Sequence, residues 1–212
     1  MRWLFVFFLA LTGVPAWCEG IVEVLARSQQ QRLEASPEAD PQAPASRTIR
    51  RTFDTLLRRA GPLPPVELRV VSGAALAETL HGRVIVVNQS LADLTEGERL
   101  FILAHELGHV MLGHWPQMTG VYQAWVPGEV LRPQTDAVAP QLGREASAMA
   151  HRHELEADTF GLRALRELGH SPRDAVSAFM AMGVRSDSAT HPGTRKRLAS
   201  LRAAEAALTG AE

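Results

Sequence analysis

The chain has 212 residues, of which 46% are hydrophobic, so it is long and apolar enough to fold as one domain with its own core. Its net charge of −1 provides no general attraction to nucleic acid, and the basic stretch 47–60 carries no base-reading motif, so we expect no nucleic-acid partner. Cys18 is the only cysteine, which excludes a fold held by internal disulfides. Packing or a bound metal ion must therefore stabilise the fold.

The N-terminal residues 1–20 have the pattern of a secretory signal. An early arginine, Arg2, precedes an apolar run that is too short to span a bilayer comfortably and that ends among small residues. We therefore expect a signal peptide cleaved near residues 18–20, with an uncleaved N-terminal anchor as the alternative. Either form predicts an exported protein, periplasmic or otherwise extracytoplasmic, and the uncleaved form would also be anchored to the membrane by its N-terminus.

Residues 21–46 are predicted to be a flexible linker. The stretch 27–47 is polar and rich in Pro, Ala, Gln and Ser, and such a composition buries too little apolar surface to order itself. The folded domain is then expected over 47–208. It begins with a predicted amphipathic helix at 47–60, in which apolar residues recur at helical spacing.

Two strands and a helix are expected next. The segments 66–72 and 83–88 are rich in β-branched residues and follow Pro- or Gly-containing turns, which is typical of strands. Thr95 and Glu98 then have the spacing of a capping box, and apolar residues recur with helical period as far as Gly113. These features predict a helix between Thr95 and Gly113.

The second half of the domain is predicted to be helical after a long loop. The stretch 115–143 contains four prolines and scattered glycines, which favours an irregular loop of the length that is usually functional or mobile. A long helix is expected over 144–168, and another begins where Ser171 is the N-cap and Pro172 is the first helical residue. A last helix carries on one side the apolar residues Leu198, Leu201 and Ala204.

The stretch 104-AHELGHVMLGH-114 contains three of the eight histidines. Residues four apart lie on one face of a helix, so His105 and His109 can bind one ion while Glu106 reaches a water molecule bound to it. This is the mechanical basis of the HExxH pattern in zinc hydrolases. The alternative is a pair of histidines that pack or cap on a buried helix.

A catalytic zinc needs a third protein ligand and an open position for water. The predicted long helix contains 153-HELEAD-158, in which Glu154 and Asp158 share a face, so one can bind the ion while the other orients a histidine ligand. Glu156 points elsewhere and is expected in solvent. An ordinary charged helix face is the alternative interpretation of these acids.

Three motifs in this order, HELGH, then ELEAD, then 190-THPGTRKR-197, resemble the HtpX-type gluzincin zinc metallopeptidases. That family includes BepA-like periplasmic enzymes and the CAAX prenyl proteases, and the resemblance covers about residues 47–205. It implies an α+β fold, a mostly helical zincin-like domain with a small β-sheet beside the HExxH helix. It also implies one Zn²⁺ per chain.

The resemblance further implies a role for each matching residue. Glu154 corresponds to the third zinc ligand, and Asp158 supports a histidine ligand beside it. The strand at 83–88 takes the place of the one that offers its edge to the substrate backbone. His191 corresponds to a histidine near the cleft that helps to stabilise the oxyanion or approaches the metal, and Arg197 to an arginine near the same cleft.

The remaining histidines and the aromatic residues of the predicted loop are given structural roles. His114 lies five residues after His109 and is rotated off the metal-binding face, so we expect it to be structural. His151 and His153 flank the second motif and are expected at the surface or behind the ligands. Tyr122 and Trp125 are interpreted as apolar residues that hold the loop down.

Together these features predict a zinc endopeptidase that hydrolyses polypeptide substrates in the cell envelope, with a role in protein quality control. Glu106 would be the general base, and His191 would assist at the oxyanion. One alternative is a latent or weakly active metal-bound chaperone or adaptor for unfolded envelope proteins. Another is a cytosolic repressor-cleaving protease with a similar AHELGH helix, which the export signal and the THP motif disfavour.

Overall fold

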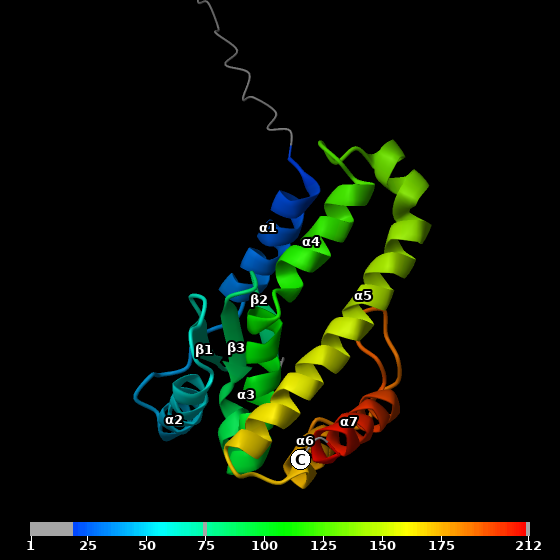
Figure 1. Cartoon of the computed structure of the whole chain (residues 1–212). Coiled ribbons are helices and arrows are strands. Elements are labelled where there is room, and N and C mark those ends of the chain that lie inside the picture. Colours follow the sequence, from blue (N-terminus) through cyan, green and yellow to red (C-terminus); the bar gives the residue numbers. More distant parts are fainter. Residues whose placement is uncertain (1–18, 74–75, 211–212) are drawn as a thin grey trace, which may run out of the picture.

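A computed structural model describes residues 19–73 and 76–210, so the predicted signal sequence lies almost wholly outside the described residues. The fold is α+β and mostly helical, as predicted from the sequence. Along this part of the chain the elements are α1 (Ile21–Glu34), α2 (Pro44–Arg59), β1 (Glu67–Val71), β2 (Ala77–Leu80), β3 (Val84–Asn88), the 3-10 helix η1 (Gln89–Asp93), α3 (Glu96–Met111), α4 (His114–Trp125), α5 (Arg132–Glu167), α6 (Pro172–Ala181) and α7 (Thr194–Thr209) (Figure 1).

The three strands form one small sheet in the order β1–β3–β2. The central strand β3 pairs in parallel with β1 and antiparallel with β2, and Val84 to Val87 are all buried. Both edges of β3 are therefore occupied, and the expectation that residues 83–88 offer an edge to a substrate is wrong. The strand that lies at the sheet edge and packs on α3 is β2, a four-residue strand too short and too polar to be detected in the sequence.

Helix α3 is the centre of the domain. The capping box between Thr95 and Glu98 is present as predicted, and 11 of the 16 residues of the helix are buried. So many buried residues leave almost no face exposed, because the sheet, α2, α5 and α6 all pack around α3. The HExxH residues thus lie on a rigid, enclosed helix.

Helices α3 and α5 approach each other closely at two glycines. A Cβ atom at Gly108 would lie 3.3 Å from the Cα of Ala157, and one at Gly161 would lie 3.3 Å from the carbonyl oxygen of Phe101. Larger residues at these positions would force the helices apart. The glycines therefore allow side chains from the two helices to meet around a single point.

The prediction of a flexible linker over residues 21–46 is wrong for most of its length, because much of it is helical. Residues 21–34 form α1, and α2 begins at Pro44. Leu33 is buried against a second face of the sheet, in a cluster with Val71, Leu80, Val84 and Val86. Ala39 also donates a backbone hydrogen bond to Val70, at 2.9 Å. A buried leucine, backbone hydrogen bonds and the ion pair of Arg32 with Glu78 hold a segment whose composition alone predicts disorder.

The predicted loop over 115–143 is also wrong, because α4 and the first turns of α5 occupy most of it. Pro116 and Pro133 lie in the first turns of these helices, where a missing backbone N–H has no helical partner to lose. Pro127 lies in the connection between them, and Pro140 lies inside α5. Most of the prolines thus mark helix starts and a turn.

Among the helices of the described residues, none is both long enough and apolar enough to cross a membrane.

Candidate metal centre

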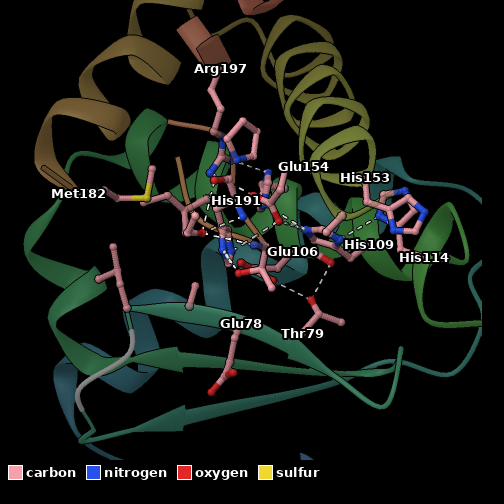
Figure 2. A pocket seen from close by; sticks show the side chains of 18 of the residues that line it. Glu78, Thr79, Glu106, His109, His114, His153, Glu154, Met182, His191 and Arg197 are labelled. Atoms are coloured by element: carbon pink, nitrogen blue, oxygen red, sulfur yellow. Dashed lines mark hydrogen bonds and ion pairs between the residues drawn. The ribbon is translucent and has the colours of Figure 1, made fainter. Parts of the chain in front are cut away.

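Three ligand atoms converge where α3 faces α5. The Nε2 atoms of His105 and His109 lie 3.1 Å apart, and their rings are turned 79° from one another. From α5, the carboxylate of Glu154 places Oε1 3.4 Å from the Nε2 of His109 and Oε2 3.6 Å from the Nε2 of His105. Figure 2 shows the side chains of His109 and Glu154 pointing toward one another across the two helices.

The spacing of these atoms fits a tetrahedral metal ion. Ligand bonds of about 2.0–2.1 Å to zinc place two tetrahedral ligands roughly 3.3 Å apart, close to all three observed separations. Glu154 is buried, and its Oε2 makes no hydrogen bond, although the Nη1 of Arg197 lies 3.0 Å away as an ion pair. Two imidazole nitrogens and a carboxylate are donors that suit zinc. The residues present therefore fit the ion that the sequence predicts.

Asp158 lies behind His105. Its Oδ1 is 3.0 Å from the Nδ1 of His105, and the guanidinium of Arg197 donates to both carboxylate oxygens at 2.8 and 2.5 Å. Burial by itself raises the pKa of Asp158, but the hydrogen bonds from Arg197 and His105 outweigh it and lower the pKa. The carboxylate thus stays ionised and orients the His105 ring.

Glu154 is kept charged in the same way. Burial again raises its pKa, but the contacts with His109, His105 and Arg197 more than reverse this effect and hold the pKa well below its usual range. Arg197, which belongs to α7, therefore neutralises the two buried carboxylates of α5. The sequence places Arg197 near the cleft, and the structure places it directly behind the ligands.

His114 is closer to the ligands than its sequence position suggests. Its Nδ1 lies 2.8 Å from the Nδ1 of His109, and its Nε2 lies 3.2 Å from Oε2 of Glu156. His153 stacks on it, with ring centroids 4.0 Å apart and planes 5° from parallel. Burial, followed by the neighbouring His109 and His153, lowers the pKa of His114 to about 3. The expectation that Glu156 is simply solvated is therefore incomplete, since it is exposed but paired.

Glu106 is hydrogen-bonded by Thr79, a residue that was not predicted from the sequence. The hydroxyl of Thr79, on β2, lies 2.7 Å from Oε2 of Glu106 and 3.0 Å from its backbone carbonyl oxygen. Because a hydroxyl has one hydrogen, it donates to one of these acceptors at a time. The sequence signal for Thr79 is weak, since β2 itself is undetected.

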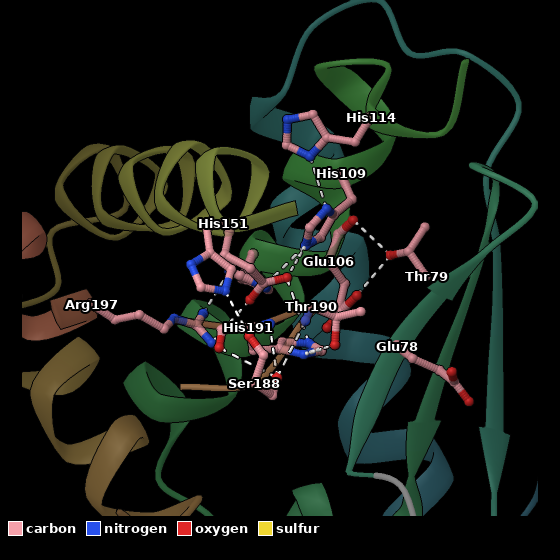
Figure 3. A network of polar contacts seen from close by, with 12 residues as sticks. Glu78, Thr79, Glu106, His109, His114, His151, Ser188, Thr190, His191 and Arg197 are labelled. Atoms are coloured by element: carbon pink, nitrogen blue, oxygen red, sulfur yellow. Dashed lines mark hydrogen bonds and ion pairs between the residues drawn. The ribbon is translucent and has the colours of Figure 1, made fainter. Parts of the chain in front are cut away.

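His191 lies at the rim of the site, in the connection between α6 and α7. Its Nε2 is 3.7 Å from Oε1 of Glu154, while 59% of its side chain is exposed. The Oγ1 of Thr190 contacts its Nδ1 at 2.8 Å, and His151 binds the backbone carbonyl of Ser188 at 2.8 Å, which ties this connection to α5 (Figure 3). The structure thus brings His191 to the ligand cluster and leaves His151 outside it.

A cavity of about 710 Å³ is lined by His105, His109, Glu154, Glu106 and His191. Residues of β2 form one wall, and the connection between α6 and α7 forms another. Apolar side chains line part of it, among them Phe101, Phe179 and Met182. A volume of this size is typical of a ligand-binding cleft. The three candidate metal ligands, the carboxylate of Glu106 and residues of β2 therefore line one space.

Comparison with known proteins agrees with this geometry. A family model described as Peptidase family M48 matches residues 46–205, which include both ligand-bearing helices and the stretch with His191 and Arg197. No curated protein matches the chain.

Proposed function

The chain belongs to peptidase family M48, and we propose from this membership and from the geometry of the site that it is a zinc-dependent endopeptidase. The observation that carries the proposal is the spacing of His105, His109 and Glu154, which matches a tetrahedral ion, with Glu106 beside them. Polypeptides are the substrate class that a peptidase family implies.

His105, His109 and Glu154 would hold the ion. When bound, Zn²⁺ supplies Lewis acidity, which lowers the pKa of a water molecule from 15.7 to about 7 and polarises the scissile carbonyl. Glu106 takes the proton of the attacking water as general base and returns it to the nitrogen of the leaving amine. When the hydroxyl of Thr79 donates to Oε2, it makes that oxygen less basic, so the other carboxylate oxygen of Glu106 is proposed to carry this proton.

The substrate backbone is proposed to add to the sheet beside β2. This strand lies at the sheet edge, and Ala77, Glu78 and Thr79 line the cavity. An extended peptide that pairs with an edge strand is aligned by main-chain hydrogen bonds, which suits a protease that accepts many sequences. His191, at the cleft rim, is proposed to stabilise the negative charge that develops on the carbonyl oxygen when the peptide bond is attacked.

The test is cleavage of unfolded casein by the zinc-loaded protein, with and without a chelator. We expect chelator-sensitive fragments, and we expect Glu106→Gln to keep its zinc and fold but to produce none. Glu96→Gln, an exposed acid on the same helix, is the matched control and should cleave normally. Cleavage by metal-loaded Glu106→Gln would refute the role of Glu106. Wild-type protein that binds casein without cutting it would support the chaperone or adaptor alternative.

The location and biological role are also proposed. The apolar N-terminal run over 1–20 supports export to the cell envelope, where a broad peptidase would degrade unfolded proteins. N-terminal sequencing of the protein recovered from a periplasmic fraction tests this. A start near residues 18–20 is expected, whereas intact protein found only in the cytosol would contradict it.

A further inference from the structure

The two histidine ligands differ in what supports them from behind. A metal-binding histidine donates the hydrogen of its second ring nitrogen to an acceptor, which fixes the tautomer and the ring orientation. For His105 this acceptor is the carboxylate of Asp158. For His109 the only atom found there is the Nδ1 of a second histidine, His114, at 2.8 Å among the described residues. An imidazole can accept this hydrogen only in one of its two neutral forms.

With an ion bound, the contacts allow one arrangement of protons. The Nε2 of His109 faces Glu154 and the Nε2 of His105, and a metal ligand must offer its lone pair there, so its hydrogen is on Nδ1. The Nδ1 of His114 then accepts, which puts the hydrogen of His114 on Nε2, 3.2 Å from the carboxylate of Glu156. The opposite arrangement would put a hydrogen on the Nε2 of His109 and leave no lone pair for an ion.

The surroundings of His114 hold its ring in this position. The residue is 4% exposed and begins α4 directly after Gly113, whose φ of 65° turns the chain sharply out of α3. His153 covers its ring face, and the Nε2 of His153 lies 3.3 Å from the side-chain oxygen of Gln117. A buried ring that is stacked on one face is suited to orienting a neighbour.

A second metal ion between His114, His153 and Glu156 is the competing explanation, because their donor atoms also lie close together. An ion bound by an imidazole lies in the plane of that ring. The rings of His114 and His153 are stacked only 5° from parallel, so their planes do not meet at a shared ion. The ring geometry therefore disfavours a metal and favours a hydrogen-bonded chain.

We propose that His114 is a positioning residue, which holds the metal ligand His109 in the tautomer that leaves Nε2 free for the ion. Glu156 completes the chain by accepting the Nε2–H of His114. The proposal rests on His109 being a metal ligand, as the proposed function holds. It assigns to the third histidine of HELGHVMLGH a role in metal binding without direct contact to the metal.

The first test is zinc affinity, measured by competition with a chelator of known affinity. His114→Phe keeps a ring but has no acceptor, and we expect the zinc dissociation constant to rise about 10–100-fold. His114→Asn places an oxygen where Nδ1 lies, so its dissociation constant should stay within about threefold of wild type. Equal affinities in all three proteins, or an equal loss in both variants, would overturn the proposal.

A milder variant keeps the test informative if His114→Phe does not fold. Glu156 is exposed, so Glu156→Gln should leave the fold intact, and we expect its zinc dissociation constant to rise by only a few fold. Circular dichroism of the metal-free proteins checks that each variant is folded. A Glu156→Gln protein that binds zinc more weakly than His114→Phe would contradict the proposed order of the chain.

The second test observes the tautomers directly. Long-range ¹H–¹⁵N correlations of the zinc-loaded protein should place the hydrogen of His109 on Nδ1 and that of His114 on Nε2. A hydrogen on the Nδ1 of His114, or two zinc ions per chain, would overturn the proposal. These readouts do not depend on cleavage, so a protein that binds zinc but cuts nothing fails the proposed function alone. A wild-type protein that binds no zinc overturns the metal centre and this role together.

Discussion

Two neighbouring groups of side chains have the same composition, two histidines and one glutamate, yet their geometry differs. The first is His105, His109 and Glu154, and the second is His114, His153 and Glu156, with α5 contributing to both. The rings of the first pair are 79° apart and point their nitrogens toward one space, whereas those of the second are stacked 5° from parallel. On the proposed function, the direction of the nitrogen lone pairs, and not the residue types, distinguishes the metal centre from its support.

The electrostatic surroundings of the two groups also differ. Behind the first group, Asp158 and Arg197 form a buried pair that keeps carboxylates charged. In the second group, burial and neighbouring imidazoles lower the pKa of His114 to about 3 and that of His153 to about 4. The first group is thus built around charge, and the second is built from neutral rings.

The largest expected difference is in metal content. Glu154→Ala should remove the ion and lower turnover on the order of 1000-fold, because a zinc site with only two protein ligands is weak. The matched change Glu156→Ala should still purify with one ion per chain. Elemental analysis of both variants and the wild type measures this. Two ions in the wild type, one of them lost in Glu156→Ala, would abolish the distinction between the groups.

Loss of Arg197 should mainly destabilise the first group. Arg197→Met leaves Asp158 and Glu154 as buried charges without their cation, which we expect to lower the free energy of unfolding by about 3 kcal/mol. Arg195→Met, on an exposed part of the same helix, is the control and should change it little. Urea unfolding of both variants decides the matter, and equal stabilities would show that Arg197 is not needed to balance these acids.

The second group should make the metal-free protein sensitive to acid. Both histidines titrate below the ordinary value of 6.5, so between pH 6.5 and 5 the unfolded chain takes up protons that the folded chain refuses. Stability is therefore full above pH 6.5 and falls as the pH is lowered, by about 2 kcal/mol for each histidine by pH 5, since one pKa unit corresponds to about 1.4 kcal/mol.

The same pH range separates these histidines from the other titrating groups. The lowered pKa values of Glu154 and Asp158 affect stability only near and below their ordinary values of 4.5 and 3.8. The pKa of His105 is raised, so its contribution to stability is full below pH 6.5 and is lost as the pH rises above that value. His153→Phe keeps a ring against His114 but binds no proton, and it should flatten the pH dependence in denaturant titrations. An unchanged slope would contradict the assignment.

The smallest expected effect concerns the base beside the first group. Thr79→Val removes the hydroxyl that contacts Glu106 but keeps the shape of the side chain, and we expect kcat to fall about tenfold with little change in KM. Thr79→Ser retains the hydroxyl and should retain most of the activity. Steady-state kinetics on a peptide substrate tests this, and a Thr79→Val enzyme with wild-type kcat would remove the proposed role of the hydroxyl.

The local parts of the site could be predicted from the sequence because they depend on helical periodicity. Residues four apart share a face whatever the rest of the chain does, so His105 and His109, and Glu154 and Asp158, could be paired from their spacing alone. The capping box that begins α3 and the N-cap Ser171 that begins α6 could be predicted as well, because caps depend on local sequence. Family resemblance supplied the pairing between the two helices.

The other parts depend on contacts that leave no local pattern. The contact of His114 with His109 follows from a left-handed Gly113 that starts α4 at once, and the prolines of 115–143 resemble loop residues when each is considered without its place in a helix. Leu33 and Arg32 hold α1 through tertiary contacts with the sheet, which leave no local pattern. Thr79 could not be assigned, since β2 is defined by its pairing with β3 more than by its own residues.

The position of Thr79 on the edge strand has a consequence for how substrate length would affect cleavage. The same four-residue strand that would pair with a peptide also touches the carboxylate that moves the proton. Substrate residues far from the scissile bond would hold this strand in place when they pair with it. The binding energy gained there would then raise kcat and not only lower KM. On the proposed function, long unfolded chains should therefore be better substrates than short peptides of the same central sequence.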